Sequence, residues 1–283
     1  FGFYLAIGLL IFTFFFGTKV NDAGRWVRIP FVGLTFQSSD FAKLALIIYV
    51  SRLLVKKKDL LNNWREGFWP VVIPIIVICG LIVKDNFSTA AILFAISMTL
   101  LFLGRVPLLK IVTLIGSGIA ALALIVLVHK AAPELNLLPR LETWENRILN
   151  YSNGEDTEAD YQIEKAKIAI ATGGIKGLGP GKSIQKNFLP QSSSDFIFAI
   201  IIEEYGLIGG FFILILYMWF LFRIVIVAQK ADTVFGKLLV LGVGLPIVFQ
   251  ALINMAVAVE LFPVTGQTLP LISSGGTSIW MTC

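Results

Sequence analysis

Two short stretches of the chain repeat the same four residues and could place a carboxylate where it does chemistry. They are Ser38–Phe41 and Ser193–Phe196, both reading SSDF, and each has a Gln shortly upstream and a long apolar run downstream. A carboxylate in such a place can act as a general base. Ser and Asp before an apolar run are also preferred helix caps, each contributing about 1 kcal/mol. For each stretch capping is the more frequent role, so a chemical role depends on where Asp40 and Asp195 lie.

The composition of the chain predicts an integral membrane protein. Of its 283 residues, 57% are hydrophobic and only 14% are charged, and the mean hydropathy is +0.84. A soluble domain carries about 25% charged residues, so this much apolar surface exceeds what one globular core buries. The basic residues do not cluster on one polar domain, and nucleic acid is therefore not an expected partner. The two cysteines predict neither a disulfide framework nor a metal site.

The apolar runs predict an all-α fold, a polytopic bundle of transmembrane helices. A run of 18 residues forms a helix about 27 Å long, close to the thickness of a bilayer core. We expect a single membrane domain over 1–283, containing a large extracytoplasmic loop at 130–195. The chain begins and ends inside apolar runs, so we expect further spans to be missing at one or both ends. The predicted membrane segments are 1–17, 40–55, 69–83, 88–104, 107–129, 196–222, 234–259 and, incomplete, 269–283.

The distribution of Lys and Arg predicts which loops face the cytoplasm. Basic residues gather after the second, fourth and sixth predicted segments, and the positive-inside rule places these loops in the cytoplasm. The remaining loops then face outward, including the long one. Asp40 and Asp195 therefore stand at the same, outer membrane boundary, each at the positive end of a helix.

The second part of the long loop, AKIAIATGGIKGLGPGKSIQKNFLP, follows an acidic and hydrophilic first part. A short apolar helix leads here into five glycines interleaved with lysines, and glycines allow close approach of the backbone to a ligand. The stretch does not fit a nucleotide-binding loop in its strand–turn–helix context, and a hairpin or re-entrant loop near the membrane interface is the simpler interpretation. Residues 260–278, rich in Pro, Gly, Ser and Thr, predict broken backbone lining a cavity enclosed by protein.

Several charged residues stand where an apolar helix is expected. Glu203 and Glu204 interrupt the helix after Asp195, and such residues usually face a cavity or form a pair. Glu203, about 80° round the helix from Asp195, is the better candidate for a shared cavity; structural pairing of both is the alternative. Lys43 could pair with Asp40 or point into that cavity. Cations beside a carboxylate suit an anionic lipid-linked substrate, whose diphosphate the cations hold.

Three stretches make the sequence recognisable: GRWVRIPFVGLTFQSSDFAKLALI, YQIEKAKIAIATGGIKGLGPGKSIQKNFLPQSSSDFIFAIIIEEYGLIGG and NMAVAVELFPVTGQTLPLISSGGTS. They resemble the SEDS family of polytopic bacterial membrane proteins, FtsW and RodA, in family order across essentially the whole chain. GLGPGKSIQKNFLP and QALINMAVAV are more similar to FtsW. The family fold has ten transmembrane helices, so the resemblance implies that the first two are missing and the tenth is cut short.

The resemblance implies a peptidoglycan glycosyltransferase that polymerises lipid II at the outer face of the bacterial cytoplasmic membrane. The implied partners are a class B penicillin-binding protein, as transpeptidase, and other division proteins, at a division septum. Asp195 matches the family's proposed catalytic aspartate. The resemblance leaves open a divalent cation, Mg²⁺ or Mn²⁺, as helper. The expected substrate-binding residues, which include Gln185 and Ser273 from the second and third stretches, are Arg25, Asp40, Lys43, Thr89, Arg147, Gln185 and Ser273.

The chain departs from the family pattern at several positions. Asp40 replaces a Glu, Asn86 replaces a usual Asp, and Glu260 stands where Gly is usual. The Asn at position 86 puts a role for that carboxylate in doubt. The position before the catalytic Asp is Ser194 rather than His, and the one histidine, His129, lies at a helix end, which argues against His-based or zinc chemistry.

We expect Asp195 to deprotonate the attacking sugar hydroxyl while Lys43, Arg25 and Arg147 stabilise the leaving diphosphate. This mechanism requires that Asp195, Lys43 and Arg25 converge on one outward-open cavity. Two alternatives remain: a lipid II flippase using the same cavity, and a scaffold that recruits division proteins without chemistry. A flippase predicts charges that continue through the bundle, whereas here they gather at the outer face, which favours the enzyme.

Overall fold

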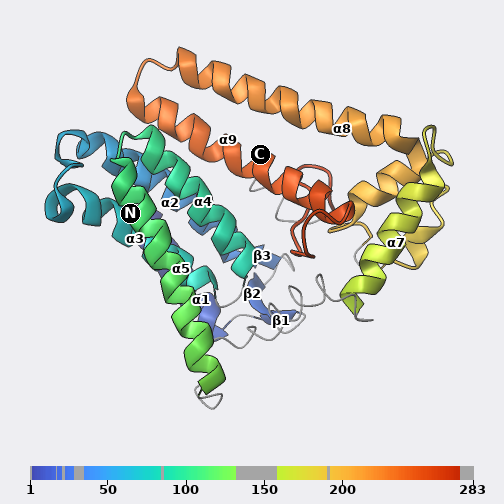
Figure 1. Cartoon of the computed structure of the whole chain (residues 1–283), viewed down its shortest axis with the longest axis horizontal. Helices are drawn as coiled ribbons and strands as arrows, with labels where there is room; N and C mark the ends of the chain where they lie inside the picture. Colours follow the sequence, from blue (N-terminus) through green and yellow to red (C-terminus); the bar gives the residue numbers. More distant parts are fainter. Residues whose placement is uncertain are drawn as a thin grey trace. The chain divides into compact units, whose positions relative to one another are not determined.

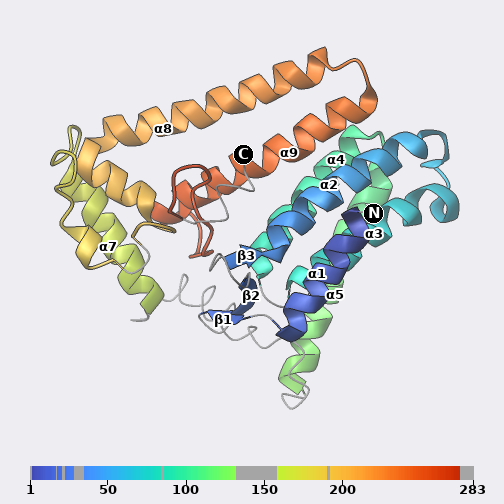
Figure 2. The same cartoon turned by 180° about the vertical axis from the view of Figure 1, so that it is seen from behind.

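A computed structural model describes residues 2–16, 18–20, 23–28, 35–83, 86–131, 158–189 and 192–274. The chain divides into two compact units, Phe1–Trp144 with Val227–Val243, and Glu145–Ile226 with Gly244–Cys283. The prediction of one domain over 1–283 stays a prediction. The elements, labelled in Figures 1 and 2, are α1 (Gly2–Phe16), β1 (Thr18–Val20), β2 (Ala23–Arg28), β3 (Thr35–Gln37), α2 (Ser38–Lys56), η1 (Lys58–Leu60), η2 (Trp64–Phe68), α3 (Trp69–Val83), α4 (Phe87–Leu103), α5 (Leu108–Ala131), α7 (Glu158–Gly173), η4 (Gln185–Asn187), α8 (Ile197–Lys230) and α9 (Val234–Ala258).

The predicted helical architecture is confirmed for the first seven membrane segments, each of which coincides with an apolar helix to within a few residues, except that α8 continues to Lys230. Among the described residues, four helices are long and apolar enough to cross a membrane, and α1 and α4 contain shorter apolar runs. The eighth predicted segment begins at 269, but residues 269–274 form turns rather than a helix. The rest of that segment, and the predicted site residue Arg147, lie outside the described residues.

Helices α1 to α4 of the first unit pack around one apolar core. Its fully buried side chains include Leu46 of α2, Ile75 and Ile78 of α3, and Leu100 of α4. In Figure 2, α2 and α4 run side by side, consistent with their shared core. The core therefore fixes the first turn of α2, where Asp40 and Lys43 lie.

A small antiparallel sheet, β1-β2-β3, precedes α2 and was not predicted from the sequence. Strand β2 pairs with β3 through Trp26↔Gln37 and Arg28↔Thr35. The β-branched and aromatic residues in these stretches suit strands, but the basic residues among them suggested a polar loop. The sheet carries the chain from α1 to α2 and contains Arg25 within its middle strand.

In the second unit, α8 is bent rather than continuous. Gly206 has φ 72° and ψ −176°, values outside the helical region, and φ in this range is natural for glycine. The loop at residues 174–188, called the α7–α8 loop below, follows α7 and lies against this bend (Figures 1 and 2). The predicted apolar helix leading into the glycines is α7, whose Ala166 and Ala169 are fully buried.

Candidate functional site

Asp195 lies in a turn immediately before α8 rather than at the helix cap. The amide of Ala199 donates to the Phe196 carbonyl at 3.0 Å, so the helical hydrogen bonds begin one residue after Asp195. Phe196 is 1% exposed and packs against Ala166 and Ala169 of α7. Burial of this ring fixes the backbone beside the half-buried aspartate, so α7 supports the candidate catalytic position from a remote part of the chain.

The main chain around Asp195 is held by α9. The Asn254 side chain, 1% exposed, donates through Nδ2 to the carbonyl of Asp195 at 2.6 Å and to the carbonyl of Gln267 at 2.7 Å. One amide group thus ties the aspartate to the segment after α9. Asn254 lies in the FtsW-like stretch QALINMAVAV but was not predicted as a site residue; the available signal was a polar side chain within an apolar run.

Ser273 continues this connection on the neighbouring residue. Its hydroxyl donates to the Ser194 carbonyl at 2.5 Å and accepts from the Leu269 amide at 2.7 Å. Ser274 donates to the Ser193 carbonyl through its amide at 2.8 Å and through its hydroxyl at 3.0 Å. These contacts favour a positioning role for Ser273, and the substrate-binding role expected for it stays a prediction.

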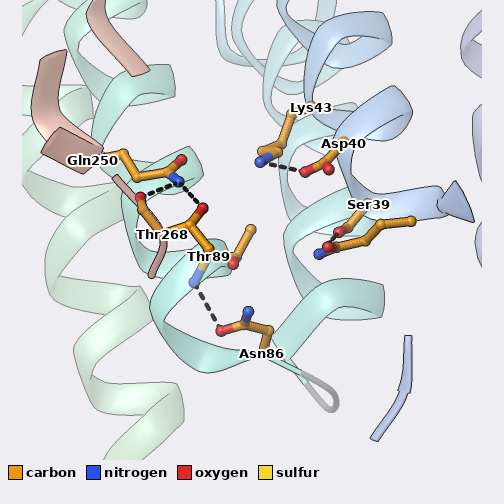
Figure 3. A network of polar contacts seen from close by, with 8 residues as sticks. Ser39, Asp40, Lys43, Asn86, Thr89, Gln250 and Thr268 are labelled. Carbon is orange, nitrogen blue, oxygen red and sulfur yellow. Dashed lines mark hydrogen bonds and ion pairs between the residues drawn. The ribbon is translucent and has the colours of Figure 1, made fainter. Parts of the chain in front are cut away.

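The carboxylate of Asp195 faces Gly266. A Cβ added at Gly266 would lie 3.6 Å from Asp195 Oδ2, and Gly266 has φ 64°, which favours glycine. Segment 266–274 is fixed further by Gln250, whose Nε2 donates to the Thr268 carbonyl at 2.9 Å, and by the Tyr217 hydroxyl, which donates to the Pro270 carbonyl (Figure 3 for Gln250). The broken backbone predicted here is therefore rigidly held against the carboxylate.

Glu203 is bound by residues of the α7–α8 loop, and the cavity that it was expected to share with Asp195 stays a prediction. Glu203 is fully buried, and its carboxylate accepts from the Ser183 hydroxyl and from the amides of Ile184 at 3.1 Å and Gln185 at 3.2 Å. Glu203 therefore fastens the α7–α8 loop to α8. Its partners are a hydroxyl and backbone amides rather than a basic side chain.

Gln185 stands at the start of η4 within this loop. Its amide is committed to Glu203, whereas its side-chain Oε1 is buried without a hydrogen-bond partner. The carbonyls of Glu203 and Glu204 accept from the amides of Leu178 and Gly179, both at 2.9 Å. The substrate-binding role predicted for Gln185 stays a prediction.

In the first unit, Asp40 and Lys43 form an ion pair of 2.7 Å, with side chains 13% and 25% exposed (Figure 3). The prediction that Asp40 caps the helix is wrong, because α2 begins two residues earlier at Ser38 and its N-cap residue is Gln37. The predicted local pairing with Lys43 is confirmed. Asp40 instead lies in the first helical turn, where a negative charge is favoured by the helix dipole.

Thr89 and Asn86 lie together at the start of α4. The Asn86 side chain accepts from the Thr89 amide at 3.2 Å and caps the helix, and Thr89 is 4% exposed (Figure 3). Asparagine and aspartate cap equally well, which gives a physical reason why Asn can occupy this position. Arg25 is placed by β2. Asp195 belongs to the other unit, and the convergence expected for Asp195, Lys43 and Arg25 stays a prediction.

Glu260, at the position where the family has Gly, has φ 59°. A residue other than glycine is strained in this conformation, which explains the usual Gly. Here the Glu260 carboxylate pairs with Lys167 of α7 at 2.6 Å. The ion pair links α7 to the end of α9.

Among the described residues, no three His, Cys, Asp or Glu side chains come together as ligands for a metal ion. These residues therefore do not form a metal site made by protein alone. A divalent cation stays a prediction, and no chemical step is assigned to it below.

The whole chain matches a known family. A family profile described as "Cell cycle protein", covering FtsW, RodA and SpoVE, matches residues 1–283. Two relatives, each named "Probable peptidoglycan glycosyltransferase FtsW", come from Saccharophagus degradans and Bacillus subtilis. They are 33% and 34% identical over 94% and 95% of this chain. The chain spans 67% of the length of each, about two thirds.

Solved structures show the same fold. One, described as "Structural coordination of polymerization and crosslinking by a peptidoglycan synthase complex", matches with a TM-score of 0.75 and 23% identity over 99% of this chain and 76% of that chain. The rod shape determining protein RodA of Thermus thermophilus matches with a TM-score of 0.67 and 22% identity over 99% of this chain and 72% of that chain. These matches, together with the apolar helices, confirm the predicted fold class and show a multi-pass membrane protein.

Proposed function

Because the chain belongs to the FtsW, RodA and SpoVE family of cell cycle proteins, as the sequence analysis predicted, we propose that it is a peptidoglycan glycosyltransferase that polymerises lipid II into glycan strands. The observation that carries this proposal is the identity of 33–34% to the named FtsW proteins over nearly the whole chain. Those names agree with the enzyme class predicted from the sequence, and the closer likeness to FtsW favours a role in cell division.

Asp195 acts as the general base. Its carboxylate accepts the proton of the 4-hydroxyl on the incoming lipid II sugar, and the oxygen attacks the anomeric carbon of the growing chain. A new carbon–oxygen bond forms as the bond from that carbon to the diphosphate oxygen breaks, and the polyprenyl diphosphate leaves with the electron pair. Water then takes the proton from Asp195. The restrained backbone and the nearby Gly266 support this role, because preorganised groups need little movement during reaction.

Cationic side chains stabilise the negative charge that develops on the leaving diphosphate. Lys43 suits this task because its ammonium is held by Asp40 at 2.7 Å in a half-buried place, where charge interactions are stronger than in bulk water. Arg25 and Arg147 complete the cationic set, with Thr89 and Gln185 as further contacts to the substrate.

The reaction takes place at the periplasmic face of the cytoplasmic membrane, at the division septum. The concentration of Lys and Arg in the loops after α2, α4 and α8 supports this orientation through the positive-inside rule. A class B penicillin-binding protein supplies the cross-linking activity, and other division proteins recruit the pair. A solved structure of the same fold, described as a peptidoglycan synthase complex that coordinates polymerization and crosslinking, supports a transpeptidase partner.

Reconstitution of the complete protein with its transpeptidase partner in liposomes tests the function. Fluorescent lipid II should be converted into a ladder of glycan chains resolved on a gel. Transfer of lipid II between leaflets without any polymer would identify a flippase instead. If both activities were absent but division proteins were recruited normally in cells, the protein would be identified as a scaffold.

A further inference from the structure

The α7–α8 loop exposes apolar and basic side chains together. Its lysines, Lys176, Lys182 and Lys186, are exposed to solvent. Soluble surfaces seldom gather large apolar side chains in so short a stretch. The exposed apolar side chains are Ile175 at 68%, Leu178 at 36%, Ile184 at 55% and Phe188 at 56%.

This exposure occurs on a firmly held backbone. The α7–α8 loop bonds to both sides of the bend in α8, since the Leu207 amide donates to the Gly174 carbonyl at 2.9 Å and the Leu178 amide donates to the Glu203 carbonyl at 2.9 Å. The buried Glu203 carboxylate fastens residues 183–185 from within. The apolar side chains therefore present a defined surface that requires a cover.

The bend in α8 locates the loop at a membrane boundary. The arm after Gly206, Leu207–Lys230, is about 36 Å long at 1.5 Å per residue, and a bilayer core is about 30 Å thick. The first residues of this arm, Leu207 and Ile208, are 51% and 62% exposed, and their amides donate to Gly174 and Ile175. The apolar surface of the loop is thus continuous with the exposed apolar surface of a helix long enough to cross a membrane.

We propose that the α7–α8 loop is a membrane-interface anchor that binds anionic phospholipids. Ile175, Leu178, Ile184 and Phe188 enter the boundary between headgroups and acyl chains, where an apolar surface flanked by lysines is stable. Lys176, Lys182 and Lys186 extend their ammonium groups to the lipid phosphates, as lysines do near an interface. The role is independent of the glycosyltransferase chemistry proposed above, because it requires only a membrane span and this loop.

Site-specific photo-crosslinking tests the anchor. The complete protein is placed in nanodiscs of phosphatidylcholine, with or without phosphatidylglycerol, with p-benzoylphenylalanine in place of Phe188. The matched control carries the same group in place of Tyr161, an exposed aromatic residue near the other end of α7. Cross-linked lipid is identified by mass spectrometry. A second protein combines the Phe188 probe with Lys176→Gln, Lys182→Gln and Lys186→Gln.

We expect the probe at 188, and not the probe at 161, to capture phospholipid. Capture should favour phosphatidylglycerol about fivefold or more, the preference expected from one lysine near a charged surface, and the triple Gln variant should lose that preference. Equal capture at both positions, or capture without headgroup preference, would overturn the proposal. Capture only of an added polyprenyl diphosphate, or of a second copy of the protein, would assign the loop to that occupant instead.

Discussion

Asp195 is positioned mainly through its backbone neighbours. Its own carbonyl and those of Ser193 and Ser194 accept hydrogen bonds from Asn254, Ser273 and Ser274, which lie 59 or more residues away in sequence. The contacts restrain the direction in which the aspartate side chain leaves the main chain. Asn254 is central to this arrangement, because one buried side-chain amide binds two carbonyls.

Asn254→Leu should therefore reduce catalysis without removing the base. Loss of both donors removes the hydrogen bonds from Asn254 to two carbonyls, at a cost of about 2 kcal/mol, and lets Asp195 shift. We expect kcat for lipid II polymerisation to fall about 10–100-fold, the effect of a small misplacement of a reacting group, with little change in KM. Steady-state kinetics of the complete protein with its partner measure both constants.

The matched control is Gln250→Leu, one helical turn earlier in α9. Gln250 holds the same segment, but its two hydrogen bonds go to the carbonyl and hydroxyl of Thr268 rather than to Asp195. If kcat fell in both variants in proportion to the decrease in their melting temperatures, Asn254 would act only through stability.

At the scale of elements, the bend in α8 and the α7–α8 loop form one unit. The helix gives up its regular hydrogen bonds at Gly206, and the loop supplies the missing partners: the carbonyls of Glu203 and Glu204 and the amide of Leu207 all bond to loop residues. A helix can break within a membrane protein where other groups satisfy its backbone in this way. Glu203, buried beside the bend, adds the side-chain contacts that close the loop.

Gly206→Ala should unfold this junction. The positive φ and the overlap of a new Cβ with the Ile175 carbonyl both oppose the substitution, and we expect a loss of about 2 kcal/mol or more. The melting temperature in detergent should fall clearly, and proteolysis should appear first between α7 and α8.

Gly80→Ala provides the comparison, because a Cβ at Gly80 in α3 meets nothing within 4 Å. It should leave the free energy of unfolding within about 1 kcal/mol of the wild-type value. A Gly206→Ala protein as stable as Gly80→Ala would refute the account of the bend.

For the molecule as a whole, local pattern predicted the helices well because each apolar run is itself the span. The sheet of β1 to β3 was missed, since Arg25 and Arg28 made a stretch of strand-forming residues resemble a polar loop. The caps assigned to Asp40 and Asp195 were misplaced by three residues and by one residue, because Gln37 and Phe196, which precede the first turns, carry no capping signal.

The candidate site was predictable in part. Asp195 could be proposed from its motif, and the pairing of Asp40 with Lys43 follows from their spacing of three residues in a helix. The roles of Asn254 and Glu203 depend on contacts between segments distant in sequence, which no periodicity encodes. Glu203 was proposed to share a cavity with Asp195 because sequence alone did not reveal the amides that surround it.

The most direct test compares lipid II polymerisation by the complete wild-type protein with that by Asp195→Asn, each with the transpeptidase partner. Asn keeps the size of the side chain and leaves the backbone contacts to Asn254 and Ser273 intact, so folding should be unchanged, as the melting temperature will show. Glycan synthesis should fall at least about 100-fold, the scale expected for loss of a general base, whereas Asp232→Asn, in the exposed turn between α8 and α9, should retain it. Undiminished chain synthesis by a folded Asp195→Asn protein would contradict the assignment of the catalytic base.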